Sequence, residues 1–415
     1  MPAVTTRADA TPVTAQSAPC RHVGLAIVAL ALGGFGIGTT EFVTMGLLPQ
    51  VADGVHVSIP AAGHVITAYA LGVVVGAPLI AALGARLPRR ALLIWLMVAF
   101  GAGNAGAALA GGYHALLLAR FLSGLPHGAY FGVASLVAAS LVPPHRRARA
   151  VSQVMLGLAV ANVVGVPAAT WMGQQLGWRS AYWLVAIIAV LTATAVLTFV
   201  PHQPPTPDAT LGRELKALRL PQVWLTLLIG TVGFGGMFAM YSYIAPTVTQ
   251  AGHMSDQVVP VILAAYGLGG VVGTVLGGRA ADHALLATMV ASLVLMAGLL
   301  ALFTLSLGNP VTASVAVFAV AVAGVTLVIC LQMRLMDVAG EAQTLGAALN
   351  HSSLNVANAL GAWLGGVVIA AGYGYRAPSW VGVGLALGGL GFALGSVALH
   401  RRTLRTRRCP DPNVA

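Results

Sequence analysis

Long apolar runs separated by short polar stretches dominate the hydrophobic pattern of this chain. A helix needs roughly 20 apolar residues to cross the ~30 Å hydrocarbon layer of a bilayer, because each residue adds ~1.5 Å. Strands would leave backbone groups unpaired in lipid, so helices are expected. The pattern therefore predicts an all-α membrane protein with twelve transmembrane helices, near 23–48, 60–84, 91–111, 115–141, 150–173, 179–200, 222–248, 258–279, 284–307, 311–333, 343–371 and 378–399.

The composition excludes the soluble alternatives. Apolar residues make up 58% of the chain and charged residues 7%, whereas a soluble protein carries about 25% charged residues. Three distant cysteines (Cys20, Cys330 and Cys409) indicate neither a disulfide framework nor a metal site. No motif indicates a cofactor. The formal net charge of +11 is better explained by basic loops on the cytoplasmic side than by nucleic-acid binding.

The basic residues predict the orientation in the membrane. With a cytoplasmic N-terminus, 18 of the 21 Lys and Arg residues fall on the inner side, and only Arg120, Arg179 and Arg376 fall on the outer side. This asymmetry follows the positive-inside rule and places both termini in the cytoplasm. The expected tails are 1–22 at the N-terminus and the basic segment 401–415 at the C-terminus.

The long polar connection at 201–221 divides the chain into two sets of six spans, 23–200 and 222–400. Its Pro-rich start cannot continue the preceding helix. Its later part, GRELKALRL, has the composition of a short amphipathic helix at the inner membrane surface. We expect this connection to be a cytoplasmic linker between two bundles.

The two sets of spans repeat each other. The segment 68–76, AYALGVVVG, matches 265–273, AYGLGGVVG, at seven of nine positions and an offset of 197. Val160-Ala161-Asn162 matches Val356-Ala357-Asn358 at an offset of 196. An even number of spans separates the copies, so the two six-helix repeats are parallel. Parallel repeats of this kind are typical of transporters that bind substrate near the midplane, between the halves.

Glycines within these segments have the spacing of close helix packing. Gly72 and Gly76 in the first repeat, and Gly269 and Gly273 in the second, are four residues apart. Small residues at this spacing let helix backbones approach closely. The spacing fits mobile packing, as a transporter needs, and also static packing.

With these residues in view, the chain resembles the major facilitator superfamily over residues 23–400. The segment 36–49, GIGTTEFVTMGLLP, resembles the signature of bacterial drug:proton antiporters related to arabinose- and sugar-efflux permeases. Arg120 to Gly124 resembles the family's Arg-x-x-x-Gly motif, and Gly157 to Pro167 loosely resembles its antiporter motif. The resemblance implies the major facilitator fold and efflux of a small molecule by alternating access.

One loop departs from the family pattern. The resemblance assigns a gating role to Arg86, Arg89 and Arg90, but Ala85 stands where the family has an acid. The second repeat keeps the acid as Asp282. We therefore expect the charge pairing of the inner gate to depend on the second half.

Glu41 is the acid that falls well inside a predicted span. A charged group at this depth costs ~2.5–3.5 kcal/mol on insertion scales and indicates a functional site. Burial favours the neutral carboxyl and a nearby cation favours the ionised one, so Glu41 is the candidate for proton coupling. The alternative is a carboxyl held structurally by hydrogen bonds between helices.

Arg120 and His127 in span 4 complete the predicted coupling group. We expect Arg120 to interact with Glu41, in a contact that protonation loosens; alternatively, its side chain reaches the outer headgroups. His127 lies near the middle of span 4 and can relay protons, or it is simply a packed neutral histidine. Amide, hydroxyl and aromatic side chains are the candidates for the substrate cavity, with packing as the alternative: Thr40, Asn162, Phe234, Phe238, Tyr241, Asn355 and Asn358.

No cluster of His, Asp, Glu or Cys suggests an enzyme, and no phosphate-binding loop suggests use of ATP. The sequence favours a proton-coupled efflux antiporter of the bacterial inner membrane, whose partners are protons, lipid and a small molecule such as a drug or sugar. Uptake by proton symport and a non-transporting membrane sensor remain alternatives. The substrate and the oligomeric state are left open, and a monomer is compatible with the sequence.

Overall fold

The computed structural model describes residues 23–84, 87–203, 219–339 and 343–408, and every regular element in these ranges is a helix. The expected N-terminal tail 1–22, most of the linker (204–218), Arg86 and residues 409–415 lie outside the described residues. The predicted all-α fold is confirmed for the described part of the chain.

The first repeat contains six spans, two of which are divided. Span 1 ends in the short helix α2. Span 5 passes through a π-helical turn, η2, which ends two residues before Pro167, whose nitrogen cannot donate a hydrogen bond. The elements are α1 (Val23–Gly46), α2 (Leu48–Gly54), α3 (Ile59–Gly84), α4 (Arg89–Leu109), α5 (Tyr113–Ser140), η1 (Pro144–Arg146), α6 (Arg147–Val160), η2 (Ala161–Gly165), α7 (Val166–Leu176) and α8 (Arg179–Phe199).

The second repeat contains a helix of 49 residues that forms two spans. At ~1.5 Å per residue it measures ~74 Å, more than twice the hydrocarbon thickness, and Ala284 breaks it with φ −154° and ψ 70°. The elements are α10 (Pro221–Leu228), η4 (Ile229–Gly233), α11 (Gly235–Ser242), α12 (Ile244–Pro246), η5 (Thr247–Ala251), α13 (Val258–Ser306), α14 (Pro310–Ala339), α15 (Gln343–Ala370) and α16 (Ala377–Arg408). Eleven helical segments of the described chain are long and apolar enough to cross a membrane. Because α13 counts twice, the twelve predicted spans are present.

Helices pair in the same way within each repeat. In the first repeat α3 packs on α5, α4 on α8, and α1 on α6 and α8. The second repeat has the corresponding pairs: the two parts of α13 pack on α14 and α16, and α11 packs on α15 and α16. The repeated sequence therefore builds a repeated set of helix contacts.

The predicted small-residue contacts occur at equivalent positions. Gly72 faces the backbone carbonyl of Phe121 so closely that a Cβ would clash with it, and Gly269 faces the carbonyl of Phe318 in the same way. Gly72 and Gly269 are 197 residues apart, and so are Phe121 and Phe318. The sequence offset thus marks a conserved backbone-to-backbone contact between the second and fourth spans of each half.

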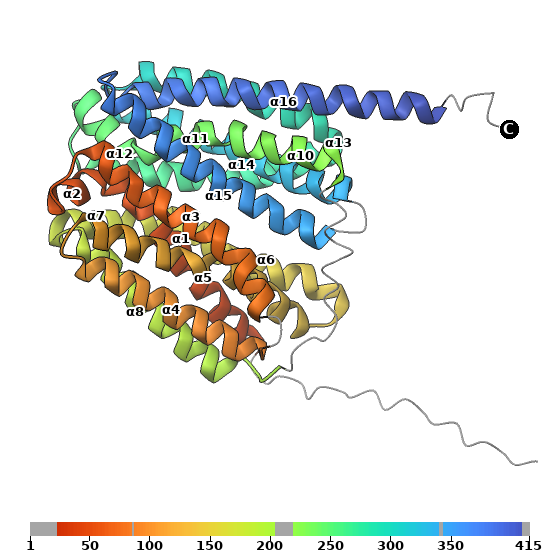
Figure 1. Ribbon diagram of the computed structural model, residues 1–415, viewed down its shortest axis with the longest axis horizontal. Coiled ribbons are helices and arrows are strands. Elements are labelled where there is room, and N and C mark those ends of the chain that lie inside the picture. The colour runs from red at the N-terminus through yellow and green to blue at the C-terminus, as the bar shows by residue number, and fades with distance from the viewer. Residues whose placement is uncertain (1–22, 85–86, 204–218, 340–342, 409–415) are drawn as a thin grey trace, which may run out of the picture.

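The two repeats pack together through α3 with α15 and through η2 and α7 with α13. Figure 1 shows the red-to-yellow helices of the first repeat below the green-to-blue helices of the second. At the predicted outer side one buried cluster joins both repeats and includes Leu48, Ala62, Ile244 and Val248. The cluster at the predicted inner end of the first repeat contains residues of that repeat only. The repeats are therefore packed together at the predicted outer side in this conformation.

Placing a side chain at the repeated glycine contact should destabilise the fold. We expect Gly269→Val to lower the free energy of unfolding by ~1–3 kcal/mol, because overpacking forces helices apart, and Gly72→Val to have a similar effect. The measurement is the melting temperature of the purified protein in detergent. The matched control is Gly298→Val, also in α13, where a Cβ would meet no atom within 4 Å. Equal melting temperatures for all three variants would contradict the packing argument.

Candidate functional site

Glu41 lies on α1, where the two repeats meet. Its side chain is only 8% exposed, and it is the one buried acid among the acidic residues that the structure describes. The preceding turn brings α1 close to its neighbours, because Gly38 leaves no room for a side chain beside Leu158 and Ala161. Glycine at this position therefore lets α1 pack closely against span 5 one turn before Glu41.

Arg120 on α5 is completely buried beside this carboxyl. Its Nη1 donates to Oγ1 of Thr40 at 3.0 Å, and its Nη2 donates to the Thr40 carbonyl at 3.2 Å. The guanidinium carbon lies 4.2 Å from the centre of the Tyr69 ring and 5.4 Å from that of Tyr182. These rings stabilise the cation through their negative faces, so Arg120 is held by two hydrogen bonds and two aromatic side chains.

The relation between Arg120 and Glu41 is electrostatic and does not involve direct pairing. Arg120 lies near enough to attract the carboxyl, but its side-chain hydrogen bonds go to Thr40, the residue before Glu41. The alternative, in which Arg120 reaches the outer headgroups, is wrong because this side chain has no exposed surface. A direct ion pair would need a change in the side-chain arrangement from this conformation.

His127 lies next to this group on the same helix. Seven residues after Arg120, it occupies the same face two turns further along α5. Its Nδ1 forms a hydrogen bond of 3.1 Å with the hydroxyl of Tyr69, and the side chain is 5% exposed. His351 of α15 is near enough to interact with it electrostatically, and His351 is itself exposed. Polar and titratable groups therefore extend from Glu41 to the surface of the second repeat.

The second repeat supplies the other side of the Glu41 site. The amide of Asn358 on α15 faces the carboxyl, and both of its polar atoms are buried without a hydrogen bond of good geometry. The next residue of α1, Phe42, stacks on Phe238 with ring centres 6.4 Å apart and meets the edge of Tyr241 at 5.9 Å. Residues 41 and 42 are thus inserted between α11 and α15.

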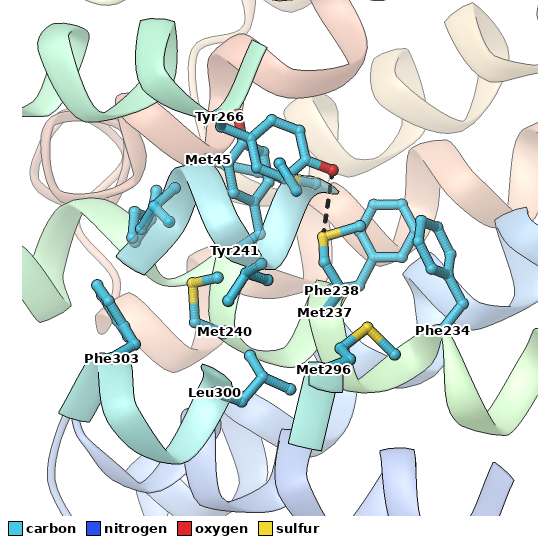
Figure 2. Close-up of a cluster of buried hydrophobic side chains, with 14 of the residues drawn as sticks. Met45, Phe234, Met237, Phe238, Met240, Tyr241, Tyr266, Met296, Leu300 and Phe303 are labelled. Carbon is cyan, nitrogen blue, oxygen red and sulfur yellow. Dashed lines mark hydrogen bonds between the residues drawn. The ribbon is translucent and has the colours of Figure 1, made fainter. Parts of the chain in front are cut away.

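Phe42 belongs to an aromatic and methionine-rich cluster of buried side chains, part of which Figure 2 shows around Phe238 and Tyr241. Tyr241 stacks on Tyr266 with ring centres 4.1 Å apart, and the Tyr266 hydroxyl donates to Sδ of Met237 at 3.3 Å. Thioether side chains are flexible and polarisable and adapt to irregular partners. The cluster includes Met45, Met237, Met240 and Met296, which Figure 2 labels, together with Met254 and Met289.

The remaining cavity candidates are divided between this cluster and local roles. Phe234 lies in the cluster and meets Phe238 edge-on at 5.3 Å. Asn162 and Asn355 instead donate to carbonyls one turn earlier in their own helices, those of Leu158 at 3.2 Å and His351 at 3.0 Å. The amide nitrogens of both residues are therefore engaged in hydrogen bonds within their own helices.

Sequence reasoning missed Asn104, Tyr69, Tyr182 and Tyr266. Oγ1 of Thr40 donates to Oδ1 of Asn104 at 2.5 Å, and Asn104 in turn donates to the carbonyl of Phe100. Tyr69 and Tyr266 are repeat partners, 197 residues apart, and both lie within electrostatic range of Glu41. The repeat itself was the signal that could have identified these two. Asn104 and Tyr182 have no comparable signal.

The described gating candidates are Arg89 and Arg90 at the start of α4 and Asp282 in α13, all at the predicted inner ends of their helices. A guanidinium nitrogen of Arg90 donates to the carbonyl of Leu197 on α8. Asp282 is exposed next to the break in α13. Their gating role stays a prediction. Elsewhere in the described chain, no three His, Cys, Asp or Glu side chains come together as a metal site requires.

Residues 30–350, most of the chain, match the profile of the Major Facilitator Superfamily. The chain belongs to this superfamily. The protein is thus a multi-pass membrane transporter of small molecules and not an enzyme, as the sequence predicted. The solved structure of a bacterial homologue of the human lysosomal transporter Spinster has the same fold, with a TM-score of 0.71, 15% identity and coverage of 91% of this chain and 97% of that one.

Three curated relatives of this major facilitator protein span nearly its whole length. The inner membrane transport protein YdhP of Escherichia coli K12 is 42% identical, over 87% of this chain and 94% of the relative. The chloramphenicol resistance protein of Streptomyces lividans is 32% identical, over 86% and 92%. A probable sugar efflux transporter of Helicobacter pylori is 29% identical, over 90% and 93%. The expected resemblance to the drug and sugar efflux branch is confirmed.

The electrostatic relation between residues 41 and 120 should appear in a double-mutant cycle. We expect Arg120→Met to lower the melting temperature most strongly at alkaline pH, where Glu41 is ionised and the substitution leaves its carboxylate without a cation. Glu41→Gln should restore part of that loss, with a coupling free energy of ~1–3 kcal/mol. The control pair joins Glu41→Gln with Arg179→Met, since Arg179 also lies over a ring, that of Trp178 at 4.3 Å. Additive effects for Glu41 and Arg120 would show that they do not interact.

Proposed function

We propose that this transporter exports a small molecule in exchange for protons, by alternating access in the bacterial inner membrane with both termini in the cytoplasm. The observation that carries the proposal is the buried Glu41 carboxyl, held between the two repeats and facing Asn358. A titratable group at the contact between two moving halves links its protonation to their relative position. Relatives named for efflux and for antibiotic resistance support the direction of transport.

Glu41 and Arg120 form the proposed coupling pair. An ionised carboxyl attracts the guanidinium and needs polar neighbours, whereas a protonated carboxyl is neutral and needs neither. In the present conformation Arg120 bonds Thr40 and not the carboxyl, which is the arrangement suited to a protonated Glu41. Loss of that proton would draw Arg120 towards the carboxyl and disturb the packing of Phe42 on Phe238. This change would favour separation of the repeats at the outer side.

We assign His351, His127 and Tyr69 to the proton path on the inner side. His351 is exposed, His127 interacts with it, and the Tyr69 hydroxyl connects His127 to the neighbourhood of Glu41 and Arg120. Imidazoles and hydroxyls both donate and accept protons. The proton that Glu41 releases to the cytoplasm would therefore pass along these groups.

The residues beside Glu41 favour a substrate with both apolar and polar surface. Aromatic and methionine side chains adapt to varied apolar shapes, and Thr40 and Asn358 add a hydroxyl and an amide. A drug-like molecule with hydroxyl or amide groups meets both requirements better than a bare hydrocarbon. The relatives' names, one for chloramphenicol and one for sugars, lie within this range.

Uptake by proton symport is the competing function, and a non-transporting sensor is a further alternative. Proteoliposomes with an imposed pH gradient separate the three, with chloramphenicol and labelled sugars as the first probes. Antiport predicts that substrate moves in the direction opposite to the proton flux. Symport predicts that substrate and protons move in the same direction. A sensor predicts no flux of any probe.

Glu41→Gln should abolish proton-driven transport and leave the protein inserted and folded. Because the amide cannot titrate, accumulation should lose its pH dependence, while exchange of labelled for unlabelled substrate should persist. The control is Asp53→Asn, since Asp53 is an exposed acid on α2. Normal pH-dependent accumulation by Glu41→Gln would overturn the proposed role of this carboxyl.

Removing the hydrogen bond between His127 and Tyr69 should slow proton transfer without removing coupling. We expect Tyr69→Phe to reduce the rate of proton-driven transport by about ten-fold, the equivalent of one lost hydrogen bond, and to leave the substrate-to-proton ratio unchanged. The rate of internal pH change in proteoliposomes measures this effect. The control is Tyr113→Phe, which removes an exposed hydroxyl bonded to His64 at 2.7 Å. An unchanged rate for Tyr69→Phe would exclude this path.

A further inference from the structure

An open cavity of about 1060 Å³ lies at the predicted inner end of the second repeat. It is formed by the start of α10, the break in α13 at Ala284 and the ends of α14 and α16. All its lining residues fall between 220 and 401, so the cavity belongs to one repeat and is separate from the contact between repeats at Glu41. Transport as proposed above does not use it.

The cavity combines a basic end with an apolar wall. Arg334, His400 and Arg401 supply positive or titratable groups against the single acid Asp337, while Leu286 and Leu394 belong to the apolar wall. Arg334 and Arg401 directly follow the predicted spans 311–333 and 378–399, which places them at the depth of the headgroups. Leu394 lies seven residues before Arg401, about 10 Å deeper in the hydrocarbon. The basic end of the cavity suits a lipid headgroup, and its apolar wall suits the upper part of one acyl chain.

Arg334 is the reason to expect an anion. Its side chain is 5% exposed, its Nη2 donates to Oε1 of Gln222 at 3.2 Å, and its Nε is buried with no hydrogen-bond partner. A buried guanidinium is costly unless its donors are satisfied. The Gln222 oxygen is shared, because Oγ of Ser396 donates to it at 2.6 Å. The cavity therefore presents an incompletely bonded arginine that is held by Gln222 of α10, which Ser396 of α16 holds in turn.

We propose that this cavity binds an acidic phospholipid of the inner leaflet, with its phosphate on Arg334 and Arg401 and an acyl chain along Leu286 and Leu394. The planar guanidinium presents paired N–H donors that match phosphate oxygens, and basic pockets between helix ends on the cytoplasmic side are suited to acidic lipid headgroups. A free phosphate would leave the apolar wall uncovered. The bound lipid would contact α13, α14 and α16 together.

The test is native mass spectrometry of the full-length protein in detergent with equal amounts of phosphatidylglycerol and phosphatidylcholine. We expect the wild type to retain phosphatidylglycerol preferentially at one site. The double variant Arg334→Gln and Arg401→Gln should lose about 25-fold in this preference, at about five-fold per arginine. The matched control is Arg279→Gln, because Arg279 is an exposed arginine at the same end of the second repeat and does not line the cavity.

A second variant keeps the test valid if the loss of buried Arg334 impairs folding. Ala287→Trp fills the cavity from an exposed position on α13 and retains both arginines; it should also reduce lipid retention. The proposal is overturned if the wild type shows no preference for phosphatidylglycerol, if Arg279→Gln loses as much as the double variant, or if glycerol phosphate displaces the lipid at equal concentration. It is also overturned if Leu215→Cys in the linker cross-links to Ala287→Cys equally well with and without phosphatidylglycerol, because the chain itself would then occupy the cavity. Binding is measured without transport, so its failure is distinguishable from failure of proton coupling.

Discussion

A carboxyl group enclosed in an apolar assembly must find polar neighbours from the assembly itself, and the surroundings of Glu41 satisfy that requirement. The cation near it, Arg120, is also buried and has the same need. Thr40 and two tyrosine rings meet that need, and Asn104 accepts in turn from Thr40. Each buried polar group thus requires the next, so the first, second, third, fourth and sixth spans of the first repeat are held in register around one ionisable group.

The two repeats share their helix contacts and differ in their chemistry. Tyr69 and Tyr266 are equivalent, and both flank the carboxyl. Asn162 and Asn358 are also equivalent, but the first donates within its own helix while the second faces Glu41. Duplication therefore explains the shape of the molecule, whereas the proposed coupling group exists once, in the first repeat. The second repeat provides an aromatic and amide surface that this group can contact or leave.

Periodic features could be predicted from the sequence because each depends on many residues or on a repeat. The twelve spans follow from apolar length, and the contact of Gly72 with Phe121 recurs at Gly269 because the same backbone geometry is built twice. The buried Glu41 followed from the cost of a charge in hydrocarbon. The bond from Arg120 to Thr40 could not be predicted, because it depends on the relative rotation of α1 and α5, to which apolar periodicity is insensitive.

The contact between the repeats also limits how alternating access can work. Opening the outer side would expose the cluster of Phe42, Phe238 and Tyr241, at a cost of roughly 25 cal/mol for each Å² of apolar surface that meets water. A change in one carboxyl cannot supply that cost over a large area, so comparable contacts must form at the inner side, where the first repeat's cluster now stands alone. Protonation then needs to change only a small free-energy difference between the arrangement closed at the outer side and the one closed at the inner side. In the proposed mechanism, protonation of Glu41 therefore only has to favour one of two arrangements whose apolar contacts are nearly equal in free energy.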